Sequence, residues 1–375
     1  MGNGKSANIR QVLTRRCSML GIPISGTFEL TARCNLQCKM CYVRLTPRQI
    51  ATIGRELSTK EWLQLAQKAK QAGMVFLLLT GGEPTLRDDF CEIYETLAQM
   101  GFSISINTNG TLLTPSLREL WHKYPPSQVN VTLYGICRED YQSLCGNPDA
   151  FSAVMDSLTW LKSENILVHL NTTIVPANHE KWLELERLSQ QLGQELRMTT
   201  YCFPPVRRGG CDTCSDFSRL PPSIAADLAV QDILYREGPD AICKLVEANS
   251  PVQSGCILDD DEGAPIRCSA GRSQFWITWN GRMTPCGMLD RPAVYPLFPN
   301  NTFSDCWEKL HAETAKIRLC PDCLICEYRD TCHNCAAVTY AETGRFDGKP
   351  EYMCQYSSAY QNSLSKIYAK LNRCK

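Results

Sequence analysis

Three closely spaced cysteines near residue 40 could hold a metal centre. They are Cys34, Cys38 and Cys41, spaced as CX3CX2C directly after a strand predicted over 27–31. Three thiolates on one loop can bind three irons of a cubane [4Fe–4S] cluster and leave the fourth iron open for another ligand. Structural zinc sites instead use four protein ligands, usually in CX2–4C pairs. The spacing alone favours neither metal over the other.

A glycine-rich turn, Thr-Gly-Gly-Glu-Pro over 80–84, follows a strand predicted over 75–79. Glycines let the backbone approach a ligand closely, and a carboxylate can pair with an ammonium group. Taken alone, the segment is more typical of an ordinary strand-to-helix turn. Asn107 and Asn109 lie at the end of the next predicted strand, where they could face a cleft or form a polar turn.

A third group of cysteines lies in the C-terminal third of the chain, which is rich in turns. The whole chain has 22 cysteines. In an oxidising compartment such a density would indicate disulfides, whereas in a reducing one it indicates ligands of metals or clusters. Four of these cysteines form a CX2CX5CX2C run that could also bind zinc. The group comprises Cys256, Cys268, Cys286, Cys323, Cys326, Cys332, Cys335 and Cys354.

Alternating strands and helices must position these residues. A capping box at Ser58 and Glu61 begins one helix, and Pro115 begins another at its first position. Six strand units predict a parallel sheet with helices outside it. Six are too few for an eight-stranded barrel, so we expect an open (β/α)6 TIM-like barrel with its chemistry at the C-terminal strand ends. The predicted strands span 27–31, 75–79, 103–107, 128–133, 167–175 and 196–203, with further helices over 88–100, 149–163 and 178–192.

Four parts make up the predicted domain organisation of this α/β protein. Residues 1–25 are a polar lead-in, and residues 26–203 form the partial barrel. Residues 204–255 are a loop and a helical bridge, and residues 256–375 are a small cysteine-rich unit. The last unit shows weak apolar periodicity, so we expect metal centres to hold it together.

The composition argues against several classes of protein. The 39 lysines and arginines balance 39 aspartates and glutamates, which speaks against a general binder of nucleic acid or of membrane surfaces. No apolar run approaches the roughly 20 residues that cross a bilayer. The first residues lack the apolar core of a signal peptide. We therefore expect a cytoplasmic protein without a nucleic-acid or membrane partner.

The cysteine loop and the glycine-rich turn together resemble the radical S-adenosylmethionine (SAM) superfamily over residues 27–203. The resemblance implies that Cys34, Cys38 and Cys41 hold a [4Fe–4S] cluster whose open iron is chelated by SAM. Met40 stands where the family usually has an aromatic residue, and 144–146 stand where many relatives carry an arginine. The residues that the resemblance places against SAM or in its cleft are Met40, Gly81, Gly82, Glu83, Asn107 and Thr132.

The C-terminal cysteines resemble the SPASM domain, a module that holds two auxiliary iron–sulfur clusters. The last short gap has two residues here, where the family has three. Three [4Fe–4S] clusters and SAM are thus implied. If Cys256 lies too far from the inner cluster to bind it, that cluster would keep an open iron for a substrate thiolate. The resemblance assigns Cys323, Cys326, Cys332 and Cys354 to the outer cluster, and Cys268, Cys286 and Cys335 to the inner cluster, with Cys256 as a candidate fourth ligand.

The remaining cysteines carry less information. Cys211 and Cys214 lie in the loop after the last predicted strand, where they are either a redox pair or two free thiols on a surface loop. Cys320 offers an alternative CX2C register with Cys323, but only the later pair keeps the gap to Cys332. We interpret the others, Cys145 among them, as packing or surface residues.

The resemblance also implies the chemistry. SAM would be cleaved to a 5′-deoxyadenosyl radical that abstracts hydrogen, and the auxiliary clusters would accept an electron or bind a substrate sulfur. We expect a peptide or protein substrate and an oxidative product such as a thioether or carbon–carbon crosslink, as in maturation of ribosomally made peptides (RiPPs). Gly287 after Cys286 counts against the sulfatase-maturating branch, which forms formylglycine and has an aspartate there. A small-molecule dehydrogenase or epimerase and a non-catalytic electron carrier are the alternatives.

Partners follow from the same resemblance. A reductant such as flavodoxin or ferredoxin would supply the electron. The residues before Cys34 leave no room for the precursor-recognition domain that many maturases carry. We therefore expect a separate leader-recognition protein, a short leader, or direct binding in the cleft. The sequence identifies no catalytic base.

Overall fold

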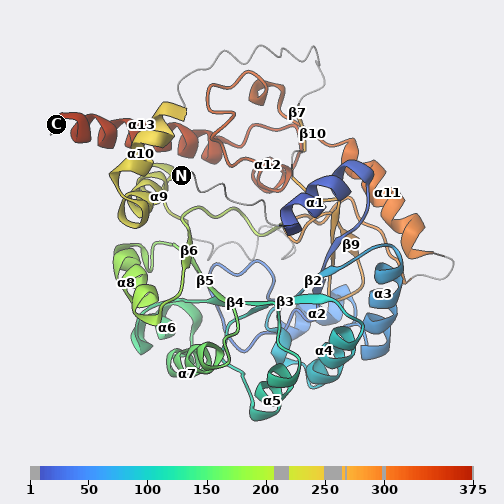
Figure 1. Cartoon of the computed structure of the whole chain (residues 1–375). Coiled ribbons are helices and arrows are strands. Elements are labelled where there is room, and N and C mark those ends of the chain that lie inside the picture. The colour runs from blue at the N-terminus through green and yellow to red at the C-terminus, as the bar shows by residue number, and fades with distance from the viewer. Residues whose placement is uncertain (1–8, 207–218, 249–263, 267, 298–300, 374–375) are drawn as a thin grey trace.

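The computed structural model shows a curved sheet wrapped by helices, with a second helical layer on one side of it (Figure 1). It describes residues 9–206, 219–248, 264–266, 268–297 and 301–373. Three cysteines singled out above lie outside the described residues: Cys211, Cys214 and Cys256.

Eight strands form one sheet in the order β6-β5-β4-β3-β2-β1-β8-β9. The first six are parallel, and each pairs with the next one along the chain. This arrangement confirms the predicted α/β fold and its open parallel sheet. The strands are β1 (Ser25–Glu29), β2 (Phe76–Thr80), β3 (Ser103–Thr108), β4 (Gln128–Thr132), β5 (Val168–Thr173) and β6 (Leu196–Thr199).

The C-terminal part of the chain contributes two strands to this sheet, which the sequence analysis did not predict. Strand β8 (Gln274–Ile277) runs parallel to β1, and β9 (Met283–Thr284) pairs antiparallel with β8. The indole N–H of Trp276 donates to the buried carboxylate of Glu29 at 2.9 Å. The cysteine-rich part is therefore joined to the barrel by a strand ladder and by a buried hydrogen bond.

Helices cover the outer face of the parallel strands. Helix α3 begins with the predicted capping box, in which the backbone N–H of Ser58 donates to Glu61 at 2.9 Å. Two helices begin later than predicted: α4 begins at Phe90, after a turn at residues 88–89, and α8 begins at Trp182, directly after a 3-10 turn over His179–Lys181. The outer helices are α3 (Thr59–Gln71), α4 (Phe90–Gln99), α5 (Pro115–Lys123), α7 (Ala150–Ser163) and α8 (Trp182–Leu192).

Three further helices in the same half of the chain were not predicted. They are α1 (Ile9–Leu20), α2 (Pro47–Ile53) and α6 (Arg138–Cys145). Helix α1 lies within the expected polar lead-in, and its apolar side chains at helical spacing, among them Ile9, Val12 and Leu13, are exposed and bury no face of the helix. Helix α6 ends at Gly146, whose φ of +74° is the left-handed conformation that favours glycine.

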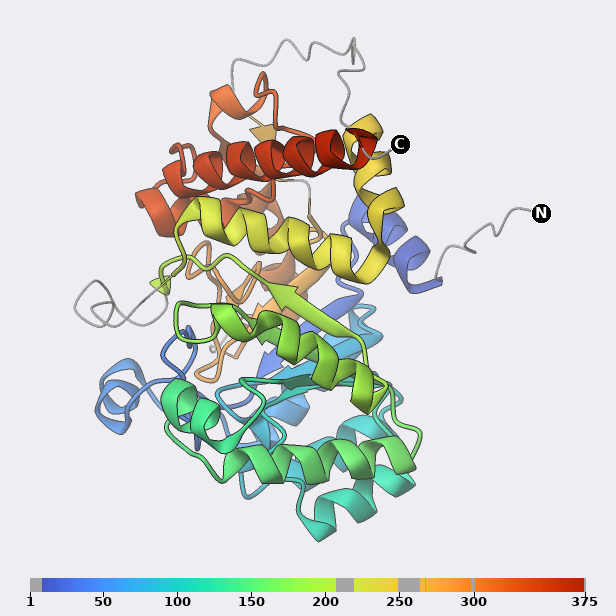
Figure 2. The same ribbon diagram turned by 90° about the vertical axis from the view of Figure 1, so that its left-hand side faces the viewer.

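A second layer of helices lies beside the end of the sheet, where α13 runs along α9 (Figure 2). The predicted bridge over 223–247 is two helices, because Pro239 follows Gly238 at a φ of +80°. Among the described residues, no helix combines the length and apolar character needed to cross a membrane. This layer contains α9 (Pro222–Glu237), α10 (Pro239–Ala248) and α13 (Glu351–Arg373). Helix α12 (Ala336–Thr343) contacts β10 (Arg318–Leu319), which pairs with β7 (Ala264–Pro265), and α11 (Phe303–Ala315) lies beside α3 on the other side of the molecule (Figure 1).

Helix α13 corrects the expectation that the C-terminal unit has little apolar core. Leu364 and Ile367 of this helix pack with Val230 of α9 and Ile242 of α10 in a separate apolar cluster. The helix escaped prediction because its apolar residues are widely spaced among serine, glutamine and tyrosine. Metal centres are therefore not the only source of stability for this unit.

Candidate functional site

The three cysteines of the CX3CX2C motif lie on the loop that follows β1, at the C-terminal end of the sheet. Backbone N–H groups donate to two of the sulfurs, from Leu36 to Cys34 at 3.4 Å and from Arg44 to Cys41 at 3.2 Å. Such N–H donors to sulfur are typical around cluster thiolates, where they help to set the reduction potential. Burial raises the pKa of Cys34 to about 12, so this thiol needs a bound cation to ionise at neutral pH.

The two glycines of the glycine-rich turn bring it directly against the backbone that leads into the cysteine loop. The N–H of Gly82 donates to the carbonyl oxygen of Thr31 at 2.7 Å. A Cβ at Gly81 would lie 2.6 Å from that oxygen, and a Cβ at Gly82 would lie 2.2 Å from the carbonyl oxygen of Arg33. Glycine is therefore required here by contacts within the protein, whether or not a ligand also approaches.

Glu83, the acidic residue of the same turn, is fully buried and joins the ends of β2 and β3. One carboxylate oxygen accepts from the hydroxyls of Thr85 and Thr108 at 2.6 and 2.8 Å. The other accepts from the backbone N–H of Asn109 at 2.7 Å. Burial raises the pKa of Glu83, and these hydrogen bonds oppose that rise. The contact between Glu83 and the SAM amino group stays a prediction, and these donors already engage both oxygens.

Asn109 connects the end of β3 to the cysteine loop. Its side-chain amide donates to Asn35 at 2.9 Å and contacts the sulfur of Cys34 at 3.7 Å. Its amide oxygen accepts from the hydroxyl of Thr111 at 2.6 Å, which in turn accepts from Asn35. The residue thus fixes the position of the first cysteine relative to the sheet.

Polar side chains from the inner face of β3 to β6 line a cavity of about 430 Å³. Asn130 donates to Asn107 at 2.7 Å, and Nη2 of Arg197 lies 3.4 Å from Nε2 of His169. The predicted cleft residues Asn107 and Thr132 thus share one cavity, whereas Met40 is half-buried against the main core. The lining residues are Leu78, Asn107, Gln128, Asn130, Thr132, Asn171 and Arg197.

Most of this cavity was not predicted, although the residue pattern of β4 indicated part of it. In β4 the alternating residues Gln128, Asn130 and Thr132 are polar while Val129 and Val131 are apolar. A strand buried on both sides would be apolar throughout, so this alternation indicates a hydrated inner face. Arg197 could not be found in this way, because the predicted strand gives no reason to expect a cation inside a barrel.

The segment that replaces the usual arginine, residues 144–146, lies against the cysteine loop. The N–H groups of Gln37 and Lys39 donate to the carbonyl oxygens of Cys145 and Leu144, at 2.8 and 3.3 Å. The pKa of the Cys38 thiol is raised by the neighbouring thiol of Cys145 and by burial, and the nearby hydroxyl of Tyr134 opposes this rise. These contacts show how the loop is held without an arginine.

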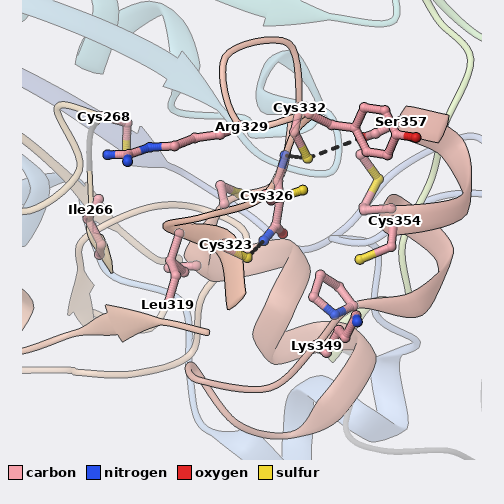
Figure 3. Close-up of a pocket in the computed structure, with 16 residues that line it drawn as sticks. Ile266, Cys268, Leu319, Cys323, Cys326, Arg329, Cys332, Lys349, Cys354 and Ser357 are labelled. Carbon is pink, nitrogen blue, oxygen red and sulfur yellow. Dashed lines mark hydrogen bonds between the residues drawn. The ribbon is translucent and has the colours of Figure 1, made fainter. Parts of the chain in front are cut away.

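Six of the predicted auxiliary-cluster cysteines line one cavity of about 360 Å³ in the C-terminal unit (Figure 3). The sulfur of Cys332 accepts from the hydroxyl of Ser357 at 3.2 Å and from the backbone N–H of Asn334 at 3.4 Å. Six cysteine side chains thus line one space, where they could serve as ligands of iron–sulfur clusters. The six are Cys268, Cys323, Cys326, Cys332, Cys335 and Cys354.

Cys286, the seventh described ligand candidate, lies in the turn after β9, and its sulfur accepts from the N–H of Met288 at 3.3 Å. It does not line the cavity of the other six. A Cβ at Gly287 would lie 2.7 Å from the ring of Trp276. The Trp276 ring therefore fills the space into which a side chain at position 287 would project.

Single metal ions and iron–sulfur clusters place different demands on their cysteine ligands. Within the described ranges, no three histidine, cysteine or acidic side chains converge on a point that would hold one metal ion. Structural zinc needs four ligands at close, tetrahedral positions. A cubane distributes its irons around a larger volume, so its cysteines stand further apart.

A comparison with protein families decides the nature of the barrel. Residues 28–189 match the model of the radical SAM superfamily. The barrel is a radical SAM domain. A radical SAM domain implies one [4Fe–4S] cluster and SAM, and the loop of three thiols with N–H donors fits such a cluster.

Similar proteins extend over nearly the whole chain. The AdoMet-dependent heme synthase of Methanosarcina barkeri is 26% identical over 355 residues, which are 90% of this chain and 98% of that protein. Native anSMEcpe with bound AdoMet and Cp18Cys peptide has a TM-score of 0.65 at 16% identity, covering 94% of this chain and 99% of that one. Streptococcus suis SuiB bound to precursor peptide SuiA has a TM-score of 0.62 at 18% identity, covering 95% and 84%. At these identities the two structures show the fold alone.

Proposed function

We propose that this radical SAM enzyme oxidatively modifies a residue of a peptide or protein, and that it uses two auxiliary [4Fe–4S] clusters besides the one that binds SAM. The observation that carries the proposal is the cavity lined by six cysteines in the unit attached to the barrel. A radical enzyme that only rearranges its substrate has no need for further electron acceptors. Extra clusters therefore favour a reaction in which the substrate radical loses an electron.

The described thiols suit this assignment. Hydrogen bonds from N–H or O–H groups reach proposed ligand sulfurs in all three places: Cys34 and Cys41 on the loop, Cys286 after β9, and Cys332 in the cavity. When bound, the first cluster with SAM supplies a 5′-deoxyadenosyl radical. The proposed ligands are Cys34, Cys38 and Cys41 for that cluster, Cys323, Cys326, Cys332 and Cys354 for the outer cluster, and Cys268, Cys286, Cys335 and Cys256 for the inner one.

The cavity inside the barrel favours a polar substrate. Amide side chains both donate and accept hydrogen bonds, as peptide groups do, and Asn107, Asn130 and Asn171 all line this space. These side chains are partly buried, and an apolar ligand would offer no partner for the donors and acceptors that they still present to the cavity. SAM contacts by Thr132 and by the turn at 81–83 would occupy the end of the cavity near the cysteine loop.

A second candidate function is the modification of a tetrapyrrole. It rests on the similarity to the M. barkeri heme synthase, which extends over 98% of that protein. The observation that favours it within the structure is Arg197 with the nearby His169, because an exposed cation on the wall of the cavity can bind a substrate carboxylate. Peptides with acidic side chains would satisfy the same cation.

Cleavage of SAM in the presence of alternative substrates tests the proposal. Anaerobically reconstituted enzyme would receive SAM, a flavodoxin or dithionite as reductant, and either peptides encoded beside the gene or porphyrin precursors of haem. Where a peptide needs a leader, the leader-recognition protein is added as well. We expect a peptide to stimulate formation of 5′-deoxyadenosine and to lose two hydrogen atoms, detected by mass spectrometry. Stimulation by porphyrins alone would replace the peptide proposal with the tetrapyrrole one.

A further inference from the structure

Two thiols meet beneath the cysteine loop, and only one of them belongs to the CX3CX2C motif. Cys38 is 7% exposed and Cys145, at the end of α6, is fully buried. The two side chains lie close enough for each thiol to affect the pKa of the other. The thiol of Cys145 also reaches the carbonyl oxygen of Tyr141 at 3.1 Å, one turn earlier in the helix. A cysteine that simply fills space would not need to face the central thiol of the loop.

The backbone holds this pair in place. The N–H groups on either side of Cys38, those of Gln37 and Lys39, donate to the carbonyl oxygens of Cys145 and Leu144. The two segments therefore run at hydrogen-bonding separation, which is the range in which neighbouring segments accommodate a disulfide. Gly146, at a φ of +74°, ends the helix directly after Cys145 and lies against Gln37, where a Cβ would be 3.6 Å from that side chain.

We propose that Cys38 and Cys145 form a reversible disulfide when the loop holds no cluster, which makes Cys145 a redox modification site. The inference rests on the proposed function in one respect, namely that Cys38 is a cluster ligand. When the cluster is bound, the Cys38 sulfur is committed to iron and the disulfide cannot form. When the cluster is lost, Cys145 is a buried thiol outside the motif, on a segment that stays hydrogen-bonded to the residues on both sides of Cys38.

The chemistry balances with a peroxide as the oxidant. One thiol is oxidised by hydrogen peroxide to a sulfenic acid, with release of water. The second thiol attacks that sulfur, the disulfide bond forms, and a second water leaves. Two electrons have then passed from the two sulfurs to the peroxide. A dithiol reductant reverses the reaction by exchange and restores both thiols.

The disulfide would have two consequences for the enzyme. A loop with only Cys34 and Cys41 free cannot supply three thiolates, so cluster insertion is blocked until the disulfide is reduced. In return Cys38 is protected from oxidation to sulfinic acid, which is irreversible for most proteins. Damage by oxygen would then be repairable by reduction followed by cluster insertion.

The choice of partner is specific to this structure. Cys34 and Cys41 lie on the same loop as Cys38 and are half-buried, whereas the largest influence on the pKa of the Cys38 thiol comes from Cys145. The sulfurs of Cys34 and Cys41 instead accept from the backbone N–H groups of Leu36 and Arg44. Oxidation should therefore join Cys38 to Cys145 in preference to either neighbour.

Disulfide mapping tests the proposal on full-length protein. Reduced protein is freed of metal by chelation, treated with hydrogen peroxide, alkylated and digested for mass spectrometry. We expect a peptide pair joined through Cys38 and Cys145 that disappears after treatment with dithiothreitol. Crosslinks from Cys38 to Cys34 or Cys41 in its place, or alkylation of both Cys38 and Cys145 after oxidation, would overturn the proposal.

Recovery of cluster binding provides the second readout. Wild type oxidised by peroxide and then reduced should regain at least about nine-tenths of its iron on reconstitution, because its disulfide is reversible. Cys145→Ser and Cys145→Ala should regain only about two thirds of it, because over-oxidised Cys38 prevents binding of the four irons of the first cluster, while Cys91→Ala, altered on α4, should behave as wild type. Equal recovery in all four proteins would refute a protective role. A Cys38→Ala protein that binds as much iron as wild type would refute the ligand assignment instead, whether or not the disulfide forms.

Discussion

Gly82→Ala is the substitution that most directly tests how the glycine-rich turn supports the cysteine loop. The added Cβ would lie 2.2 Å from the carbonyl oxygen of Arg33 and 3.0 Å from that of Ala32. The contact is with backbone, so no side-chain rotation can relieve it. The turn must therefore move away from the chain that leads into Cys34.

The cost can be estimated from the contacts that this movement breaks. Overpacking of a tight site costs about 1–3 kcal/mol. Two backbone hydrogen bonds, from Gly82 to Thr31 and from Glu83 to Arg33, contribute about 1 kcal/mol each. Gly82→Ala should thus lower the free energy of unfolding by about 3–5 kcal/mol, measured by urea denaturation of the metal-free protein.

Gly101→Ala is the matched control. Gly101 has a φ of +83° but nothing within 4 Å of its Cβ position, so alanine there adds only backbone strain of about 1–2 kcal/mol. We further expect Gly82→Ala to bind less iron on reconstitution, whereas Gly101→Ala binds as much as wild type. Equal destabilisation and equal iron binding in the two variants would refute the role assigned to the turn.

Three more predictions concern other parts of the molecule. Burial and the neighbouring Asp232 raise the pKa of Glu186 to about 7, so the folded protein retains a proton that the unfolded chain releases near pH 4.5. The free energy of unfolding should therefore fall as the pH rises from about 4.5 to about 7. Glu186→Gln should remove about 2–3 kcal/mol of this loss when the free energies of unfolding at pH 5 and pH 8 are compared. A variant with the same pH dependence as wild type would contradict this. Trp276→Phe removes the N–H donor to the buried Glu29 and should lower the free energy of unfolding by about 1–3 kcal/mol in urea denaturation. A smaller effect would contradict the role of this hydrogen bond in joining the sheet to the C-terminal unit. Ser357→Ala removes a hydroxyl donor to the sulfur of Cys332, a proposed cluster ligand. The reduction potential of an auxiliary cluster should therefore fall, as measured by a redox titration followed by electron paramagnetic resonance. An unchanged potential would argue against Cys332 as a ligand.

Local signals in the sequence were enough to predict the parallel strands. The capping box at Ser58 and the apolar run over 75–79 each involve residues within one turn or one strand, and both were found where predicted. The positions of Cys34, Cys38 and Cys41 could also be predicted, because a motif at the end of a parallel strand must lie at the same edge as its neighbours.

Contacts between distant residues could not be predicted in this way. Strand β8 pairs with β1 across more than half of the chain, and four residues of β8 carry no periodicity that would name their partner. The contact of Cys145 with Cys38 is of the same kind, because it depends on where α6 ends relative to a loop. The hydrogen bonds of Glu83 are a subtler case, since the residue was found but its partners at the end of β3 were not.

Iron and sulfide quantification after anaerobic reconstitution tests the central claim most directly, namely that the barrel loop and the C-terminal cavity hold separate clusters. Wild type is compared with a triple variant in which Cys34, Cys38 and Cys41 are replaced by alanine, and SAM cleavage is measured in parallel. We predict about twelve irons per chain for wild type and about eight for the variant, with SAM cleavage abolished. About four irons in wild type and none in the variant, with zinc bound elsewhere, would contradict the two auxiliary clusters.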